Sequence, residues 1–278
     1  MDNLSTFSST DLLKLWKPAS NSSGEDNGQV TIIGGSELFH GAPLLALKAA
    51  SKFVDMVFFA TPEKSVGMVA QKMKSSLLSF VWVPWEEASD YVIKSDCCLI
   101  GPGMMRFKSE KRAKLHTREG LDEAGSATYE IVRRFLTDFP MKRWVIDAGA
   151  LQVMEKEWIP RQSILTPNKH EFEMLFGDMA LDKASQKYEC TIVLKGPVTL
   201  VSTCGKTKQV KGGNPGLTKG GTGDVLAGLT TALYAKNDTH LSACAASFIQ
   251  KKVADRLFKE VGQNYSAEDL ANSISNIN

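Results

Sequence analysis

The run Gly-Gly-Thr-Gly-Asp at residues 220–224 stands directly before an apolar, helix-like stretch at residues 225–229. N–H groups in the first turn of a helix lack intrahelical acceptors and carry partial positive charge, so glycines there let an anion approach the backbone. Asp224 could then remove a proton from a hydroxyl held beside that anion. An acidic first-turn residue after a tight turn explains the same residues, and this motif alone supports the two interpretations about equally.

Further polar or glycine-rich residues directly follow five predicted strands. They are residues 34–36, 101–103, 147–149, 166–168 and 195–196. Open parallel sheets bind ligands at the carboxyl ends of their strands, where the loops leading into helices collect. We therefore expect these five strand ends to line one active-site cleft.

Each charged candidate at these strand ends also has a structural interpretation. Asn168 and Glu171 have the spacing of a helix N-cap and its N3 partner, but an amide beside a carboxylate can also hold hydrated magnesium or a substrate hydroxyl. Lys195 follows a buried run and could pair with a phosphate, or it could be an ordinary exposed lysine. Asp147 is either a carboxylate in the cleft or the cap of the next turn.

The elements that must position these residues alternate along the chain. Strands are predicted at residues 30–33, 56–59, 80–83, 97–100, 144–146, 163–165, 192–194 and 200–201, and helices at residues 42–53, 66–76, 108–137, 171–176, 225–235 and 241–261. Many of the strands are continuously apolar, as expected when both faces of a parallel sheet are covered. The pattern predicts an α/β fold with a mostly parallel sheet.

The N-terminal region has a different composition. Residues 20–28 are rich in Ser, Gly and Asn, and a short amphipathic piece at residues 11–16 precedes them. Such polar segments are typically mobile. Because no repeat, linker or low-complexity tract interrupts the remainder, we expect a flexible segment at residues 1–28 and one domain at residues 29–278.

Composition excludes several other classes of protein. The 278 residues carry a net charge of +2, which gives no electrostatic reason to expect nucleic acid or a membrane surface as a partner. The five cysteines have no Cys-x-x-Cys spacing, so they indicate neither a disulfide framework nor a zinc ribbon. Cys97, Cys98 and Cys190 lie in apolar runs typical of a core. Without a signal peptide or a membrane-spanning run, we expect a cytoplasmic protein.

Familiar catalytic motifs are missing from the sequence. There is no Gly-x-Gly-x-x-Gly of a Rossmann site, no P-loop and no Gly-x-Ser-x-Gly nucleophile elbow. His40 and His170 lack partners at metal-ligand spacing, so a zinc site is not expected. The interpretation that remains is phosphate chemistry at a helix N-terminus, with an aspartate as the base.

The ordered set of motifs from about residue 29 to about residue 255 resembles one family, the ADP/ATP-dependent NAD(P)H-hydrate dehydratases. The residues that carry the resemblance are 33–36, 40–43, 101–103, 145–151, 165–168 with Glu171, 193–196 with Thr199, 213–216 and 220–228. The family has a ribokinase-like fold. The resemblance therefore implies a three-layer α/β/α arrangement around a mostly parallel central sheet, with no separate lid domain.

The family restores nicotinamide cofactors to which water has added. The resemblance implies that NADH hydrate and NADPH hydrate are the substrates, that ADP or ATP is the phosphoryl donor, and that Mg²⁺ is the cofactor. Asp224 would be the catalytic base, removing the proton of the hydroxyl on carbon 6 as the terminal phosphoryl group transfers to it. Expulsion of the phosphate would then restore the dihydronicotinamide.

The same resemblance assigns binding residues. The nucleotide would be held by Lys195, Gly196, Pro197, Val198, Thr199, Gly221, Thr222 and Gly223. The hydrated cofactor would be held by Ala42, Gly101, Gly103, Asn168, Lys169, His170, Glu171 and Asp224. Asn168 and Glu171 would also organise the magnesium ion.

Some features depart from the bacterial pattern and leave alternatives open. Met104 and Met105 replace the usual Leu-Gly, and residues 168–171 are more like the eukaryotic form, so the choice between ADP and ATP stays open. The resemblance also implies a homotetramer and functional pairing with a separate NAD(P)H-hydrate epimerase. Two other functions remain in view: a ribokinase-like kinase of a vitamin precursor such as hydroxymethylpyrimidine or hydroxyethylthiazole, and a catalytically weak nucleotide-binding protein.

Overall fold

A single mixed sheet organises the protein. The computed structural model describes residues 4–75, 77–106 and 120–276. In sequence order the strands are β1 (Gln29–Ile33), β2 (Met56–Ala60), β3 (Val81–Val83), β4 (Cys97–Ile100), β5 (Arg143–Ile146), β6 (Ile164–Leu165), β7 (Thr191–Leu194), β8 (Thr199–Thr203) and β9 (Lys206–Val210). Their order across the sheet is β3-β2-β1-β4-β5-β6-β7-β8-β9. Strands β1 to β7 pair in parallel, whereas β8 and β9 are antiparallel to their neighbours.

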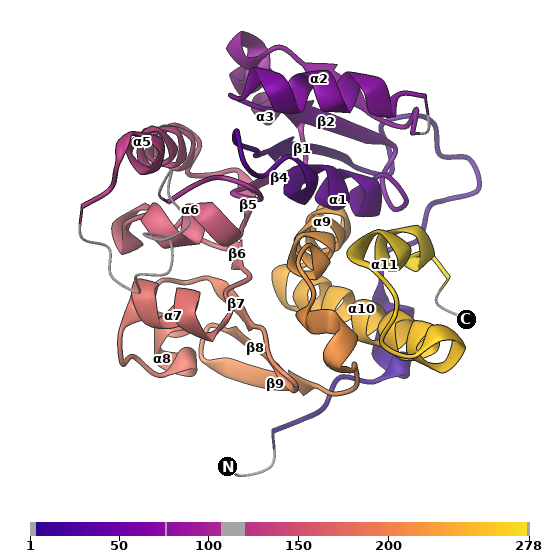
Figure 1. Cartoon of the computed structure of the whole chain (residues 1–278). Coiled ribbons are helices and arrows are strands. Elements are labelled where there is room, and N and C mark those ends of the chain that lie inside the picture. The colour runs from indigo at the N-terminus through magenta and orange to yellow at the C-terminus, as the bar shows by residue number, and fades with distance from the viewer. Residues whose placement is uncertain (1–3, 76, 107–119, 277–278) are drawn as a thin grey trace.

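Helices cover both faces of this sheet, as Figure 1 shows. One layer contains α1 (Gly41–Ala50), α2 (Lys64–Met73), α9 (Thr222–Tyr234), α10 (Thr239–Val261) and α11 (Ala267–Ser273). The other contains α3 (Ala88–Lys94), α5 (Glu123–Asp138), α6 (Ala148–Val153), α7 (Lys169–Phe176) and α8 (Leu181–Lys187). Four 3₁₀ helices are also described: η1 (Ser9–Lys14), η2 (Trp85–Glu87), η3 (Lys156–Trp158) and η4 (Pro215–Thr218).

The two helical layers explain why the strands are continuously apolar. All five residues of β1 are buried. Val30 and Ile32 pack into the core beneath α1, α9 and α10, whereas Ile33 packs into the core on the opposite face. Alternate residues of one strand thus serve two cores. The α/β prediction, with its three layers and mostly parallel sheet, is confirmed, and the described residues form no second sheet that could serve as a lid.

The predicted strands match observed ones, but one strand and several helices were missed. Strand β9 alternates Lys and polar residues at the sheet edge and buries only Val210, so it has no apolar run. The missed helices α3, α6, α8 and α11 have six or seven residues each. The helix predicted at 108–137 is observed from Glu123, after Asp122 accepts a hydrogen bond from Gly125 N–H; residues 107–119 lie outside the described part of the chain.

Part of the N-terminal region lies against the domain. Phe7 is buried, its N–H donates to Gln209 O of β9 at 2.9 Å, and its ring packs edge-on against Phe248 of α10. Trp16 N–H donates to Asn237 Oδ1 at 2.7 Å. These contacts attach residues 7–16 to β9 and to the α9–α10 connection. The boundary at residue 28, and the flexibility of residues 1–28, stay predictions.

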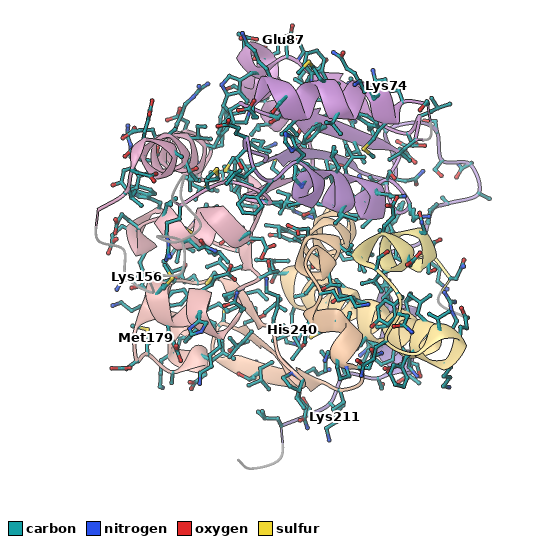
Figure 2. The ribbon with its side chains drawn as sticks, in the orientation of Figure 1. Lys74, Glu87, Lys156, Met179, Lys211 and His240 are labelled. Carbon is teal, nitrogen blue, oxygen red and sulfur yellow. The ribbon has the colours of Figure 1, made fainter. Side chains whose placement is uncertain are left out.

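The three cysteines predicted to lie in the core are buried. Cys97, Cys98 and Cys190 are buried, and burial raises the pKa of both Cys98 and Cys190 to about 12. Figure 2 shows Lys74 and Glu87 projecting from the outer edge of the molecule. Within the described residues no helix has the length and apolar content needed to cross a bilayer.

Helix α9 is held against α1 by a close backbone approach. A Cβ atom at Gly228 would overlap the carbonyl oxygen of Ala46. Glycine is required here for space, because the two helices could not otherwise approach so closely. The position of the α9 N-terminus therefore depends on this contact.

We expect Gly228→Ala to lower the free energy of unfolding by about 1–3 kcal/mol, because α1 and α9 must separate to accept the methyl group. Urea denaturation measures this change. Gly24→Ala is the matched control, since its Cβ would meet nothing within 4 Å. Equal stability of the two variants would show that the α1–α9 contact is not tight.

Candidate functional site

The N-terminus of α9 has the geometry of an anion site. Gly221 precedes it with φ +91°, a left-handed conformation that favours glycine. The N–H groups of Gly221 and Gly223 donate no hydrogen bond to any described residue. A Cβ at Gly223 would lie 3.5 Å from Lys195 Nζ, so the backbone of this turn faces that ammonium group. Gly223 and Lys195 thus lie side by side at a helix N-terminus whose N–H groups are available to an anion.

Lys195 reaches into the cleft from the end of β7. Its Nζ lies 2.9 Å from Asp147 Oδ1 and 3.8 Å from Glu171 Oε2. Burial alone would lower the pKa of Lys195, but the Asp147 and Glu171 carboxylates outweigh burial and hold that pKa above its ordinary value. Lys195 is therefore a charged, paired group that lines the cavity, and its side chain is not that of an ordinary exposed lysine.

Asp147 stands at the N-cap position of α6, but its side chain interacts with Thr166 and Lys195 instead of capping the helix. It is almost completely buried and makes no capping hydrogen bond to α6. Its Oδ1 accepts hydrogen bonds from Thr166 Oγ1 at 2.8 Å and from Lys195 Nζ at 2.9 Å. The groups at the ends of three adjacent strands, β5, β6 and β7, are thus joined through one oxygen atom.

Asn168 and Glu171 form the capping box that their spacing allowed. Glu171 N–H donates to Asn168 Oδ1 at 2.9 Å, and Asn168 N–H donates to Glu171 Oε2 at 2.8 Å. Glu171 Oε1 accepts a further hydrogen bond from Gln152 Nε2 at 3.1 Å. The box fixes the Glu171 carboxylate beside Lys195. The described residues contain no group of three or more His, Cys, Asp or Glu side chains placed to hold a metal ion.

Asp224 lies in the first turn of α9 within this charged cluster. Burial, followed by the nearby Asp147 carboxylate, raises the pKa of Asp224 to about 7, while Lys195 opposes the increase. A carboxyl group with a pKa near neutrality can both accept and return a proton.

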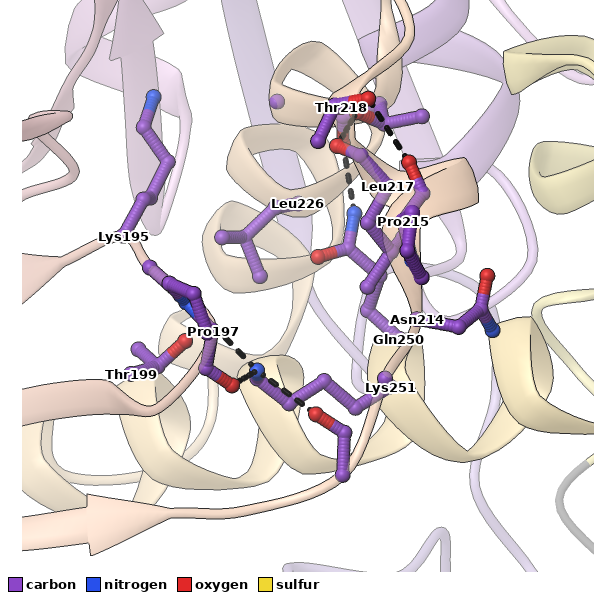
Figure 3. A pocket seen from close by; sticks show the side chains of 15 residues that line it. Lys195, Pro197, Thr199, Asn214, Pro215, Leu217, Thr218, Leu226, Gln250 and Lys251 are labelled. Carbon is purple, nitrogen blue, oxygen red and sulfur yellow. Dashed lines mark hydrogen bonds between the residues drawn. The ribbon is translucent and has the colours of Figure 1, made fainter. Parts of the chain in front are cut away.

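A cavity of about 470 Å³ opens beside the α9 N-terminus (Figure 3). Six of the residues predicted to hold a nucleotide line it: Lys195, Gly196, Pro197, Thr199, Thr222 and Gly223. Val198 and Gly221 do not line it; the Val198 side chain is largely exposed, and a Cβ at Gly221 would meet Leu45 and Ala267. Six of the eight residues predicted to hold the nucleotide therefore line one cavity, and Val198 and Gly221 do not.

Several residues of the cavity wall were not predicted. They are Gly212, Gly213, Asn214, Pro215, Leu217, Thr218, Leu226, Gln250 and Lys251. One signal could have identified part of this wall, the turn at residues 213–216 within the family motif. Lys251 and Gln250 lie mid-helix in α10, where sequence carries no such signal.

Lys251 connects two loops that form part of the cavity wall. Its buried Nζ donates to the carbonyl oxygens of Pro197, Gly212 and Gly196 at 2.8, 2.9 and 3.2 Å, as Figure 3 shows. Burial lowers the pKa of Lys251, but three carbonyl acceptors satisfy the three N–H bonds of the ammonium form. This side chain links the loop after β7 to the loop after β9.

The predicted substrate residues are divided between two environments. Gly101 and Gly103 adopt positive φ and lie so close to Asp147 O and Phe39 O that a Cβ would overlap those atoms. A Cβ at Gly103 would also lie 3.3 Å from the Ala42 Cβ, so these predicted residues bring the loops after β1 and β4 together.

Lys169 and His170 lie on the exposed side of α7. Their side chains approach Glu173 at 3.7 and 3.8 Å, whereas Lys195 pairs with Asp147 and Glu171. Of the predicted substrate residues, Glu171 and Asp224 are the ones that interact with Lys195.

A second hollow of about 310 Å³ lies near the ends of β1 and β4. It is lined by Gly35, Ser36, Glu37, Pro62, Glu63, Met104, Met105, Glu123, Ala124, Ala127, Thr128 and Ile131. Met104 and Met105, which replace the usual Leu-Gly, are both buried there.

Comparisons with known proteins agree with this arrangement. A family model described as NAD(P)H-hydrate dehydratase matches residues 30–276. The chain is 38% identical over 277 residues to a bifunctional NAD(P)H-hydrate repair enzyme of Methanocaldococcus jannaschii, covering 96% of this chain and 51% of that protein. It is 28% identical to an ADP-dependent (S)-NAD(P)H-hydrate dehydratase of Nitrosopumilus maritimus, covering 96% and 95% of the two chains.

A solved structure shows the same fold. The Bacillus subtilis ADP/ATP-dependent NAD(P)H-hydrate dehydratase, co-crystallised with ATP and Mg²⁺, superposes with a TM-score of 0.78 at 20% identity, covering 100% of this chain and 98% of that one. The chain spans about half the length of the bifunctional relatives it matches. Because the family model covers nearly the whole chain, the protein belongs to the NAD(P)H-hydrate dehydratase family.

Proposed function

We propose that the protein dehydrates the (6S) form of NADH hydrate and NADPH hydrate to the parent cofactor, converting ADP to AMP or ATP to ADP with release of phosphate. One observation carries the proposal: the Asp224 carboxyl group, with a pKa near 7, lies at an anion-binding helix N-terminus beside Lys195. The names of the relatives supply the substrate class. The adjacent cavity offers the space for a nucleotide.

The proposed reaction has two steps, the transfer of a phosphoryl group to the C6 hydroxyl and the elimination of phosphate. Asp224 accepts the proton of the C6 hydroxyl, whose oxygen attacks the terminal phosphorus while the bond from that phosphorus to the bridging oxygen breaks. The nitrogen lone pair of the ring then expels phosphate from C6, and loss of a proton from C5 restores the ring double bond. The N–H groups of Gly221 and Gly223 would stabilise the transferring phosphoryl group.

Magnesium fits this site as an ion that arrives with the nucleotide. Mg²⁺ in phosphoryl-transfer sites is held mainly by phosphates and water, with one or two carboxylates from the protein. Glu171 would supply a carboxylate, fixed in place by the capping box with Asn168. When bound, the ion would neutralise phosphate charge during transfer.

We extend the proposal to the domain organisation, the location and the assembly of the protein. Residues 29–278 would form the single catalytic domain, and the protein would act in the cytoplasm as a homotetramer. The relatives named bifunctional are about twice as long as the matched region. We propose that an NAD(P)H-hydrate epimerase works together with this enzyme.

The direct test supplies purified protein with Mg²⁺ and NADH hydrate, adding ADP or ATP separately, and follows the return of dihydronicotinamide absorbance. We expect recovery with at least one nucleotide, which would also identify the donor. The matched control omits the nucleotide. If neither nucleotide restores absorbance, the dehydratase proposal fails, and a phosphorylated product from a vitamin-precursor alcohol would support the kinase alternative.

We expect Asp224→Asn to lower turnover by about 10²- to 10⁴-fold, because an amide cannot accept the hydroxyl proton. Nucleotide binding should persist and should not weaken, since the N–H groups at the α9 N-terminus remain and one negative charge near the phosphate is removed. Steady-state kinetics and calorimetric titration with ADP measure the two effects separately. Unchanged turnover in this variant would remove Asp224 from the role of base.

The pKa of Asp224 also predicts how stability depends on pH. Because the folded-state pKa of about 7 exceeds the ordinary value of 3.8, the unfolded chain loses this proton first as pH rises. The wild type should therefore lose stability relative to Asp224→Asn between about pH 4 and pH 7, by on the order of 1–3 kcal/mol. Urea denaturation at pH 5 and pH 8 measures this difference.

Asp269→Asn provides a control of opposite sign. Hydrogen bonds from Ser266 lower the pKa of Asp269, so its ionised form stabilises the folded state at neutral pH. The Asp269→Asn variant should therefore be less stable than the wild type at pH 8. A constant difference between wild type and Asp224→Asn across this range would contradict the raised pKa.

A further inference from the structure

We infer that Gln250 selects the base of the bound nucleotide, favouring adenine over purines that carry an oxygen at position 6. The inference rests on the proposed use of a nucleotide and names the residue that would read its base. Gln250 lies in the middle of α10 and lines the cavity beside the α9 N-terminus.

The orientation of the Gln250 amide is fixed by one hydrogen bond. Its Nε2 donates to the backbone carbonyl of Thr222 at 2.6 Å, and the side chain is only 7% exposed. Because a carbonyl oxygen can only accept, the amide nitrogen must face Thr222 and the amide cannot rotate without losing this bond. The acceptor Oε1 is therefore directed elsewhere.

Oε1 of Gln250 is an unused acceptor on the cavity wall. It accepts no hydrogen bond from the described residues, and Figure 3 shows it pointing into the space between α9 and the loop that carries Pro197. The other uncharged amide of the wall, Asn214, already bonds Gly216 N–H and the Tyr265 hydroxyl through its oxygen. Lys251 donates to three carbonyl groups.

The surroundings of Gln250 suit a planar ring. Leu226, Leu217, Pro197 and Pro215 supply apolar surface on the walls that Gln250 joins. We place the phosphates beside Gly223 and Lys195, which line the same cavity. A base resting on apolar side chains, with one polar group at its edge, is the common form of such pockets.

The chemistry of the base decides the selectivity. Adenine carries an amine at position 6 that can donate to Gln250 Oε1. Guanine and hypoxanthine carry a carbonyl oxygen there, which would place two acceptors against each other and leave both without a donor. Such a mismatch weakens binding by roughly 10- to 100-fold.

The test compares ADP with IDP, whose base has oxygen in place of the amine. Calorimetric titration of the wild type should give a dissociation constant roughly 10- to 100-fold lower for ADP. Gln250→Met removes the acceptor while keeping the side-chain length, so the two constants should converge to within about threefold. Equal affinities in the wild type would overturn the inference.

Two controls separate base selection from other effects. Lys252→Met changes an exposed neighbour on α10 outside the cavity and should keep the wild-type ratio. The wild type is also titrated with 2′-deoxy-ADP: a loss of affinity there, with ADP and IDP equal, would mean that Gln250 reads the ribose, and the inference fails. The comparison of ADP with IDP in the wild type needs no variant, so equal affinities overturn the inference even if Gln250→Met does not fold.

Binding is the readout because it separates this inference from the proposed reaction. If ADP binds but no NADH hydrate is converted, base selection can still be measured. If neither ADP nor ATP binds, the nucleotide site itself fails. If ADP and IDP bind equally while dehydration proceeds, base selection by Gln250 alone is wrong.

Discussion

The charge of the cleft depends on the ammonium group of Lys195. It lies 2.9 Å from Asp147, 3.8 Å from Glu171 and close enough to Asp224 to oppose the rise in that residue's pKa. Three carboxyl groups share one cation, so an approaching phosphate meets more negative than positive charge. A nucleotide can bind here only if the N–H groups of α9, a proton on Asp224 or an accompanying cation offsets this repulsion.

The sheet brings these groups together without any long loop. Asp147, Thr166 and Lys195 directly follow β5, β6 and β7, which are neighbours in the sheet and run in parallel. One oxygen of Asp147 accepts from both other side chains. Ala148 follows at φ +47°, a conformation that costs a non-glycine residue on the order of 1 kcal/mol and is offset by the packing around it. The absent side chain of Gly101 gives Asp147 O its space.

The carboxyl ends of β5, β6 and β7 could be predicted from the sequence, because these strands are buried on both faces and therefore appear as continuous apolar runs. Lys195 was found in this way, Glu171 was found from its spacing to Asn168, and Asp147 was placed at the same edge with its role open. Strand β9 was missed because an edge strand needs few apolar residues. Gln250 and Lys251 were missed because their burial comes from the packing of α10 against other parts of the chain, and a Gln-Lys pair in a helix ordinarily indicates an exposed face.

Two parts of the cavity wall are stabilised in different ways. On the wall formed by α10, Lys251 donates all three of its N–H bonds to carbonyls from two loops and Gln250 donates to Thr222 O, so the protein itself holds these side chains in place. At the N-terminus of α9, the carboxyl groups repel one another, and the N–H groups of Gly221 and Gly223 lack partners among the described residues. Binding energy gained at the α10 wall can therefore offset the cost of placing a phosphate beside Asp224, since interactions remote from the reacting atoms can support an unfavourable arrangement at the reaction centre.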